Sequence, residues 1–191
     1  MPNLINLPPF TEDGDVYVVV ETPRGSRAKT PRGSRAKFDY DPKLKTFALS
    51  KSLLTGLTYP HDWGFVPSTK ADDGDPIDIM VVHDAATFPG IVLTCRVIGI
   101  LQIEQKSKGK TERNDRLFAV PRDSHSEQAV KDVRDLSEPI QQELEKFFKA
   151  TDELEDKKLN IIGWKGPKTA VQAHQGCRQV LQEEWQVVSR P

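Results

Sequence analysis

A dense group of carboxylates lies near the middle of the chain, where residues 72–78 read Asp-Asp-Gly-Asp-Pro-Ile-Asp. Four carboxylates this close together repel one another unless a cation lies between them. Mg²⁺ binds one or two carboxylates and completes its shell with water and phosphate oxygens, so the segment is a candidate magnesium site. It is not an EF-hand, because counting from Asp73 puts Ile77 at the third ligand position and Asp78 at the glycine position. A solvated acidic turn is the alternative interpretation.

Groups that could bind a phosphate occur on both sides of this acidic segment, and Glu21 and Asp39 add two further carboxylates. Carboxylates combined with cations in this way resemble a two-metal site, which polarises a phosphoryl oxygen and lowers the pKa of a bridging water. It also offsets negative charge on the leaving group. We therefore expect hydrolysis of a phosphoanhydride bond. The phosphate-binding candidates are the arginine- and lysine-rich residues 24–37, Lys51, Tyr59 and Arg116.

The length and charge of the chain limit the other functions it could have. Its 191 residues can form one sizeable core, and its 27 basic and 28 acidic residues leave a net charge of −1. This balance argues against general binding to nucleic acid or to a membrane. No leader pattern is seen, and no apolar run approaches the roughly 18 residues of a membrane span. Because Cys95 and Cys177 lack metal-site or disulfide spacing, we expect a cytoplasmic protein.

The domain organisation is predicted to be simple, apart from one duplication. We expect an N-terminal arm over residues 1–15 and a single catalytic domain over residues 16–191. Within that domain, residues 22–29 and 30–37 are the same eight residues, Thr-Pro-Arg-Gly-Ser-Arg-Ala-Lys. Stacked structural repeats need periods of about 20 residues or more, so this repeat predicts a lengthened loop over residues 22–37.

The elements that must position these groups are mostly strands, followed by helices. Residues 38–40 and 46–49 alternate around a turn and predict a hairpin, whereas residues 59–65 are rich in aromatic side chains and have no regular pattern. Further strands are predicted at residues 17–21, 77–82, 91–103 and 117–120.

From Ser137, a plausible N-cap, the apolar residues recur on one helical face as far as residue 154. A second helix is predicted over residues 168–187. Strands first and helices last imply an α+β fold, in which the helices pack against a small curved sheet.

Several short motifs occur in a recognisable order and spacing. They are Glu21, Pro-Arg-Gly-Ser-Arg-Ala-Lys-Phe-Asp at 31–39, Tyr59-Pro60, and residues 63–65, 73–78, 88–90, 119–121, 147–148 and 163–164. Over about residues 16–165 they resemble the soluble (family I) inorganic pyrophosphatases. The resemblance implies a small closed antiparallel β-barrel, OB-like, flanked by two or more α-helices. It also implies a homo-oligomer with inorganic diphosphatase activity, which uses Mg²⁺ to hydrolyse pyrophosphate.

The same resemblance implies a role for each candidate residue. Asp75 would accept the proton of the attacking water. The residues implied to bind phosphate are Lys37, Lys51, Tyr59 and Arg116. The residues implied to hold or surround the metal ions are Asp73, Asp78, Asp75, Glu21, Asp39 and Asn114.

Several positions depart from the family pattern. Lys51 replaces an arginine, Trp63 replaces a tyrosine, and Arg116 replaces a lysine. Asn114 and Gln105 stand where the family has aspartates. A register shift that brings in Asp115 or Glu104 instead is the alternative, although strand alternation turns Asp115 away from Arg116.

The most serious departure is Thr151-Asp152, where the family has a Tyr-Lys pair that holds the departing phosphate. A carboxylate in place of that lysine would repel phosphate unless another cation compensates. The candidate cations are Lys106, Lys108, Lys110, Lys165 and Lys168.

Two other functions therefore remain open on the sequence. One is a pyrophosphatase-fold protein with altered or lost activity, which acts on or binds another phosphate compound. The other is a non-catalytic barrel that serves as a binding module. The clustered carboxylates and the balanced net charge count against nucleic acid as its ligand.

Overall fold

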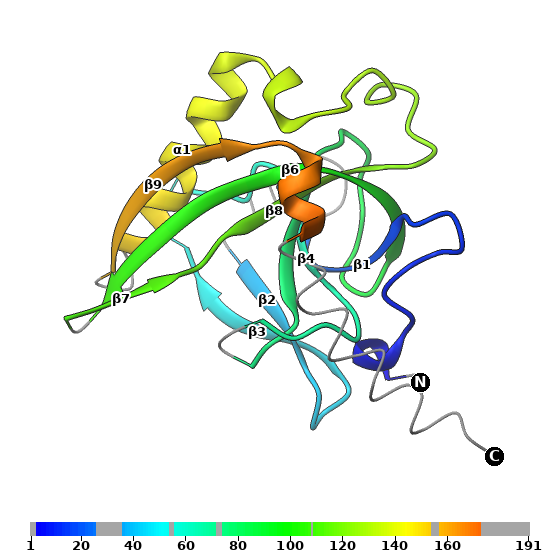
Figure 1. The fold of residues 1–191 in the computed structure, drawn as a ribbon. Coiled ribbons are helices and arrows are strands. Elements are labelled where there is room, and N and C mark those ends of the chain that lie inside the picture. The colour runs from blue at the N-terminus through cyan, green and yellow to red at the C-terminus, as the bar shows by residue number, and fades with distance from the viewer. Residues whose placement is uncertain are drawn as a thin grey trace.

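The computed structural model describes residues 3–25, 36–53, 56–71, 74–107, 109–153 and 157–172 (Figure 1). Residues 167–172 are helical in addition to the elements named below. The described elements are two 3₁₀ turns, η1 (Leu4–Asn6) and η2 (Val133–Asp135), one α-helix, α1 (Glu138–Glu153), and the strands β1 (Val16–Thr22), β2 (Ala36–Asp41), β3 (Thr46–Ser52), β4 (Asp62–Val66), β5 (Ile77–Val81), β6 (Val92–Ser107), β7 (Lys110–Arg113), β8 (Arg116–Pro121) and β9 (Lys158–Lys165).

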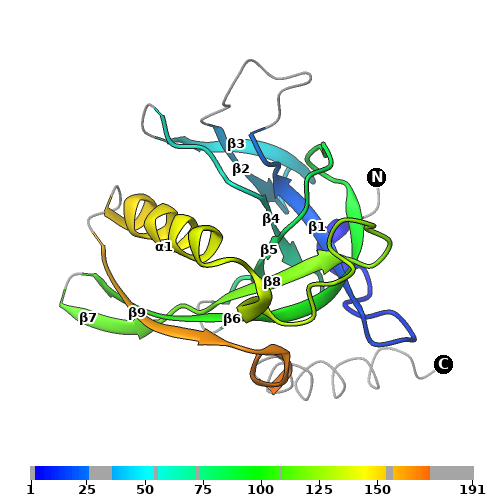
Figure 2. The ribbon, with the colours of Figure 1, turned by 90° about the horizontal axis from the view of Figure 1, so that it is seen from above.

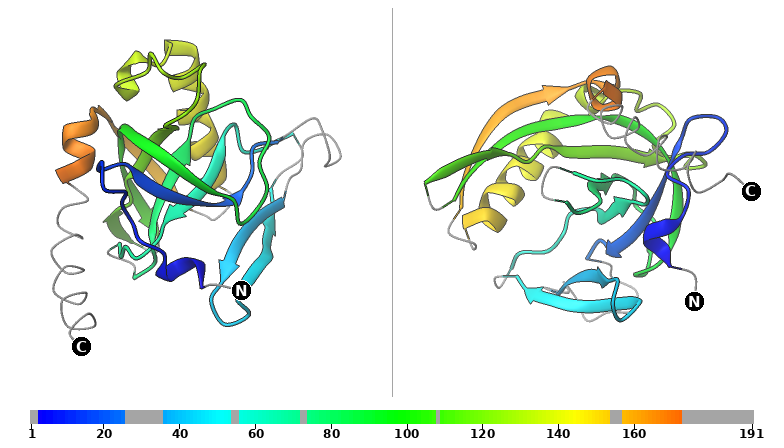
Figure 3. Two further views of the ribbon diagram at one scale, coloured as in Figure 1. Left: turned by 90° about the vertical axis from the view of Figure 1, so that its right-hand side faces the viewer. Right: turned by 60° about the horizontal axis from the view of Figure 1, so that its bottom comes forward.

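Seven of these strands form one strongly curved sheet. Its order is β1-β4-β5-β8-β6-β7, with β9 paired to the outer part of β6. Strand β1 also pairs with β6, so the pairings run from β1 through β4, β5, β8 and β6 and back to β1. Figure 3 shows this curvature from two further sides. The α+β class and the OB-like arrangement of strands follow the sequence prediction.

Two features of the sheet correct the sequence analysis. The strands are not all antiparallel, because β5 and β8 run parallel, with Ile79 opposite Leu117. Residues 59–65 were predicted to be irregular, but residues 62–65 belong to strand β4. All five of its residues are buried, so the period of two that marks a half-exposed strand is missing. Strand β9 was not predicted either.

The remaining strand predictions are confirmed. Residues 36–41 and 46–52 form the antiparallel hairpin β2–β3, a two-stranded sheet of its own. The predicted strands at residues 17–21, 77–82, 91–103 and 117–120 correspond to β1, β5, β6 and β8.

Alternation along the strands divides the apolar side chains between the two faces of the sheet. In β5, Ile79 and Val81 belong to one buried cluster with Val18 and Leu117, whereas Met80 belongs to another. The second cluster lies under α1, whose Leu144, Phe147 and Phe148 are buried in it. Figures 2 and 3 show α1 on the concave side of the long β6–β9 pair.

Helix α1 therefore confirms the prediction made from the helical period. The residues that pack it against the sheet are separated by three or four positions, as one helical face requires. The predicted second helix over residues 168–187 is helical as far as residue 172, and its remainder lies outside the described residues.

Residues before β1 also contribute to packing. Leu4, Ile5 and Leu7 lie against a third buried cluster, formed by Val19, Tyr40 and Phe65. This cluster joins β1 and β4 to the β2–β3 hairpin. Across the described ranges, no helix is long and apolar enough to cross a membrane.

Candidate active site

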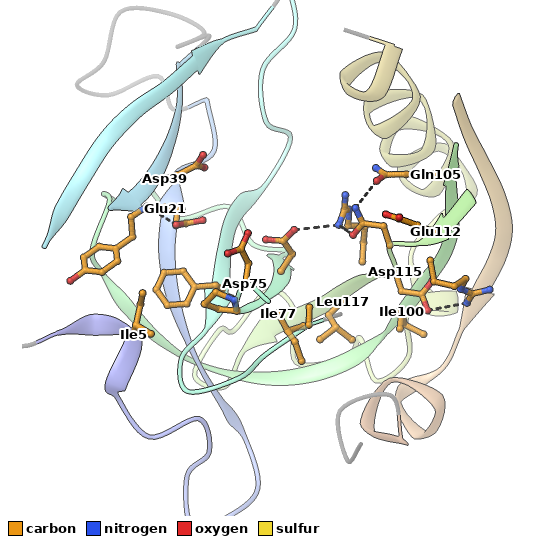
Figure 4. A pocket seen from close by; sticks show the side chains of 18 of the residues that line it. Ile5, Glu21, Asp39, Asp75, Ile77, Ile100, Gln105, Glu112, Asp115 and Leu117 are labelled. Carbon is orange, nitrogen blue, oxygen red and sulfur yellow. Dashed lines mark hydrogen bonds and ion pairs between the residues drawn. The ribbon is translucent and has the colours of Figure 1, made fainter. Parts of the chain in front are cut away.

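A cavity of about 930 Å³ opens between the β2–β3 hairpin, the start of β5, and the β7–β8 segment. Figure 4 shows Glu21, Asp39 and Asp75 on one side of it, and Gln105, Glu112 and Asp115 on the other. Most of the residues predicted for the site line this cavity. They are Glu21, Lys37, Asp39, Asp75, Asp78, Asn114 and Arg116.

Glu21 is the deepest carboxylate on the acidic side. It is the last residue but one of β1, and its side chain is buried. The backbone N–H of Tyr40 donates to its Oε1 at 2.7 Å. Burial nevertheless raises the pKa of Glu21 from 4.5 to about 7, and the carboxylates of Asp39 and Asp78 add to the rise. An added cation would favour the ionised form of this group.

The hairpin and β5 supply the other three carboxylates of this side. Asp39 lies on β2, 3.1 Å from the Lys37 ammonium, and this surface ion pair leaves both groups partly exposed. Asp78 lies on β5 and accepts from Arg116 Nη1 at 3.3 Å. Asp75 is exposed in the turn before β5. Strand and turn thus direct four carboxylates toward one cavity.

The donor set fits a magnesium ion of the kind held by few protein ligands. Within the described ranges, no group of three or more His, Cys, Asp or Glu side chains could hold a metal ion. Mg²⁺ needs only one or two carboxylates, since water and substrate phosphates complete its octahedral shell. Oxygen ligands at this density, together with a buried carboxyl group whose ionised form is disfavoured, fit such an ion.

Arg116 connects the two sides of the cavity. It begins β8, and its guanidinium carbon lies 5.5 Å from the centre of the Trp63 ring. One guanidinium nitrogen, Nη1, donates both to Asp78 and to the side-chain oxygen of Asn114. The stacked indole and the two acceptors leave this cation little freedom.

Asn114 and Gln105 extend this contact from Arg116 toward α1. The amide nitrogen of Asn114 donates to Gln105 Oε1 at 2.6 Å. The amide nitrogen of Gln105 in turn donates to Asp152 Oδ2, also at 2.6 Å. Gln105 and Asp152 are both buried at 8% and 7% exposure. A continuous run of hydrogen bonds therefore joins the end of α1 to Arg116.

Asp152, which was expected to repel phosphate unless another cation compensates, is buried and hydrogen-bonded. Burial raises the pKa of its carboxyl, while the Gln105 hydrogen bond and the charges of Arg116, Lys157 and Lys51 act in the opposite direction. Lys157 was not among the compensating cations considered from the sequence. The neighbouring Thr151 hydroxyl donates to Phe148 O within its own helix, at 2.9 Å.

Two predicted substrate-binding residues lie beside the cavity rather than among its lining residues. Lys51 is opposite Lys37 in the β2–β3 pairing. Burial lowers its pKa, and so does the charge of Lys37. Tyr59 is buried against Trp63 and Phe147, with ring centres 5.9 and 4.8 Å away. Burial raises the pKa of Tyr59, so its hydroxyl stays protonated.

Some predicted residues fall outside the described ranges. Asp73 is one of them, as are residues 26–35 of the duplicated loop. Asp115, the alternative to Asn114, is committed elsewhere, because its carboxylate accepts from the Ile103 N–H at 2.9 Å and from Arg113 at 3.0 Å. Glu112 and Arg113 line the cavity and were not singled out from the sequence. The alternating charges of the β7 hairpin were their only signal.

A second polar cluster, outside the cavity lining, is centred on a fully buried carboxylate. Asp62, in β4, is 0% exposed and accepts from the Arg24 N–H at 2.7 Å and the Thr87 hydroxyl at 2.5 Å. Its other partner is the ring of His83, at 2.8 Å. Burial lowers the pKa of the adjacent His61 to about 4, so that imidazole is neutral near pH 7. This cluster ties β1, β4 and the loop after β5 together.

The chain is similar to several known proteins in both sequence and fold. Residues 18–182 match a family model described as inorganic pyrophosphatase. An inorganic pyrophosphatase from Synechocystis sp. is 36% identical over 163 residues, or 85% of this chain and 89% of the relative. One from Thermus thermophilus is 33% identical over 181 residues, or 93% and 97% of the two chains. The crystal structure of a Thermus thermophilus inorganic pyrophosphatase superposes with a TM-score of 0.82 at 31% identity, covering 95% and 99%.

Proposed function

The chain belongs to the inorganic pyrophosphatase family and is an inorganic diphosphatase, and we propose that the cavity described above is where it hydrolyses pyrophosphate. The observation that carries this proposal is the meeting of Glu21, Asp39, Asp75 and Asp78 with Arg116 and Lys37 in one cavity. Carboxylates that attract divalent cations, beside cations that attract phosphate, suit a substrate that enters as a metal–phosphate complex.

The family implies a divalent metal cofactor, and we propose that it is Mg²⁺. Asp75 and Asp78, with Asp73 beside them in sequence, would hold it, and Glu21, Asp39 and Asn114 would surround it. When bound, Mg²⁺ supplies positive charge that polarises phosphoryl oxygens and acidifies the attacking water. The raised pKa of Glu21 supports this assignment, because a bound divalent cation would favour the ionised form of this buried group.

In the reaction, the oxygen of a water molecule bonds to one phosphorus, and the bond from that phosphorus to the bridging oxygen breaks. We assign Asp75 as the general base that accepts the water proton, since it is the exposed carboxylate of the turn at the cavity. The second phosphate leaves with the bridging oxygen, and positive side chains offset its charge.

The same cavity supplies those positive side chains. Arg116 can donate to phosphate oxygens through guanidinium nitrogens that Asp78 and Asn114 do not use. Lys37 lies on the hairpin side. Lys51, opposite Lys37, adds a third cation, and the buried Tyr59 supports Trp63 under Arg116. We propose these four residues as the substrate-binding set.

Other features expected from the sequence stay proposals. The cyclic pairing of β1, β4, β5, β8 and β6 supports a small closed barrel. We also propose the arm over residues 1–15, one catalytic domain over residues 16–191, a cytoplasmic location and a homo-oligomeric state. Sedimentation velocity of the full chain would test the last of these, and a monomer at micromolar concentration would contradict it.

A second candidate function is hydrolysis of another phosphoanhydride on the same site. One observation favours it, since Gln105 and Asn114 line the cavity as neutral amides that bond to each other. Fewer negative charges on this side of the cavity would suit a substrate that enters with fewer bound metal ions. A panel of nucleoside triphosphates and phosphomonoesters, assayed beside pyrophosphate, separates the two functions. A higher kcat/KM for any other member of the panel would favour the second candidate.

A further inference from the structure

We propose that Asp152 is a positioning residue: it fixes the Arg116 guanidinium through an intervening pair of side-chain amides. The amide pair consists of Gln105 on β6 and Asn114 between β7 and β8. This inference rests on the proposed function, in which Arg116 binds a phosphate of the substrate. Asp152 does not line the cavity itself, and it is connected to Arg116 by hydrogen bonds through Gln105 and Asn114.

The proposal depends on the direction of each hydrogen bond in the run. A carboxylate only accepts, so Asp152 turns the nitrogen of the Gln105 amide toward itself. The oxygen of that amide then faces Asn114 and accepts from its nitrogen. The oxygen of Asn114 is therefore left to accept from Arg116. One buried carboxylate thus sets the orientation of two amides and presents an acceptor to the cation.

Without that carboxylate, neither amide has a fixed direction. An amide can rotate by 180° at little cost unless its partners distinguish oxygen from nitrogen. Gln105 is buried, so an unpaired nitrogen there would be costly and would favour the rotated form. In the rotated form, the Asn114 nitrogen would face the Arg116 guanidinium, donor against donor. Arg116 would then lose one of its two acceptors and keep only Asp78.

A lysine at position 152 reverses the direction of the run. Its ammonium only donates, so it would draw the Gln105 oxygen toward itself and rotate both amides. If Asp152 instead stood merely where a phosphate-binding cation would serve better, Asp152→Lys would strengthen substrate binding. The two explanations therefore predict opposite changes in KM for the same variant.

The matched variants are Asp152→Asn, Asp152→Ala and Asp152→Lys. Asparagine can still accept from Gln105 through its oxygen, so it permits the original direction of the run while removing the charge. Glu153→Lys is the control, because it makes the same charge change on the neighbouring exposed residue of α1. Each variant is assayed as the full chain for phosphate release from pyrophosphate with Mg²⁺.

We expect Asp152→Lys to raise KM by about tenfold or more, as partners that orient a functional group commonly do. The KM of Asp152→Asn should stay within about threefold of the parent value, and the KM of Asp152→Ala should lie between those of the other two variants. In all three variants kcat should change less than KM. Glu153→Lys should leave both constants unchanged. A lower KM in Asp152→Lys would overturn the proposal, as would an equal loss in Asp152→Asn and Asp152→Lys.

Dependence on Arg116 is tested by a double-mutant cycle. If Asp152 acts through Arg116, Asp152→Lys should add almost nothing to the defect of Arg116→Ala. Independent, additive losses would contradict the proposed run of hydrogen bonds. Urea denaturation of each variant separates this effect from a loss of folding, and if Asp152→Lys does not fold, Asp152→Ala takes its place in the cycle.

Failure of the proposed function would look different. If the parent chain releases no phosphate from pyrophosphate, the same variants are compared by calorimetric binding of inorganic phosphate in the presence of Mg²⁺. The expected order of affinity is unchanged, with Asp152→Asn binding more tightly than Asp152→Lys. The reverse order would overturn the role of Asp152 whether or not the chain is a hydrolase.

Discussion

Glu21→Gln should stabilise the metal-free protein while weakening its response to Mg²⁺. The carboxyl is buried and its pKa is raised from 4.5 to about 7, chiefly by burial. A carboxyl group whose pKa is raised in the folded state destabilises the fold only at pH values at which the group would be ionised in the unfolded chain. The penalty is therefore absent below pH 4.5, grows as the pH rises, and is complete above about pH 7.

The size of this effect follows from the same two pKa values. At about 1.4 kcal/mol per pH unit, a rise from 4.5 to about 7 amounts to roughly 3 kcal/mol. Glutamine has nearly the same shape, carries no charge, and keeps an oxygen that can accept from the Tyr40 N–H. In EDTA at pH 8, the variant should thus unfold with a free energy about 3 kcal/mol above that of the parent chain, and at pH 4 the two should agree.

Urea denaturation followed by circular dichroism measures both differences, with the slope checked for constancy. Added Mg²⁺ should raise the midpoint of the parent chain more than that of the variant, because the charge that helps to hold the ion is gone. A variant that is no more stable than the parent at pH 8 in EDTA would refute the reasoning. So would a difference that persists unchanged at pH 4.

Three further variants test the fold around the site. Asp62→Ala should lower the free energy of unfolding, measured by urea denaturation, by about 3 kcal/mol or more, because the backbone N–H of residue 24 and two side chains lose a buried acceptor. A decrease of less than about 1 kcal/mol would contradict this. Gly64→Ala should abolish soluble, folded protein, since the new methyl would lie 2.0 Å from the Val19 carbonyl oxygen; a native circular dichroism spectrum would show the packing to be wrong. Deleting residues 22–29 should change stability by less than about 1 kcal/mol, because loop length affects closure entropy only weakly, and loss of cooperative unfolding would argue otherwise.

Much of the sheet could be predicted because most strands expose a regular pattern. Strands β1, β5 and β6 are rich in β-branched residues, β8 contains a short apolar run, and the β2–β3 turn begins with Asp41 and Pro42. Strand β4 was missed because it is buried on both faces, which removes alternation, and because Gly64 reads as a break. Its glycine is explained only by the carbonyl of Val19 on the neighbouring strand.

Other features of the sheet could not be predicted because they depend on pairing between residues far apart in the sequence. Strand β9 pairs with β6, about sixty residues earlier, and its own sequence contains two lysines, an asparagine and a glycine that weaken the strand pattern. The parallel pair of β5 and β8 also leaves no local signal, because direction depends on how the chain between them runs. Sequence patterns describe an element but not its partner.

The site, too, has one part that could be predicted from the sequence and one part that could not. Its acidic side could be predicted, since Asp75 and Asp78 lie within one short segment whose charges need a cation. The environment of Asp152 could not, because it depends on α1 bringing that residue to Gln105, 47 positions earlier in the chain. A carboxylate that looked repulsive in the sequence is buried and hydrogen-bonded in the structure.

The most direct test of the account is phosphate release from pyrophosphate by the full chain and its Asp75→Asn variant, each with Mg²⁺ and with EDTA. Asparagine keeps the shape of this exposed side chain but is a far weaker base, so the fold should be spared. We predict Mg²⁺-dependent release by the parent chain and a loss of about 100-fold or more in kcat for the variant. Equal activity in the variant would remove Asp75 from the mechanism, and no release by the folded parent chain would contradict the assignment of this cavity to pyrophosphate.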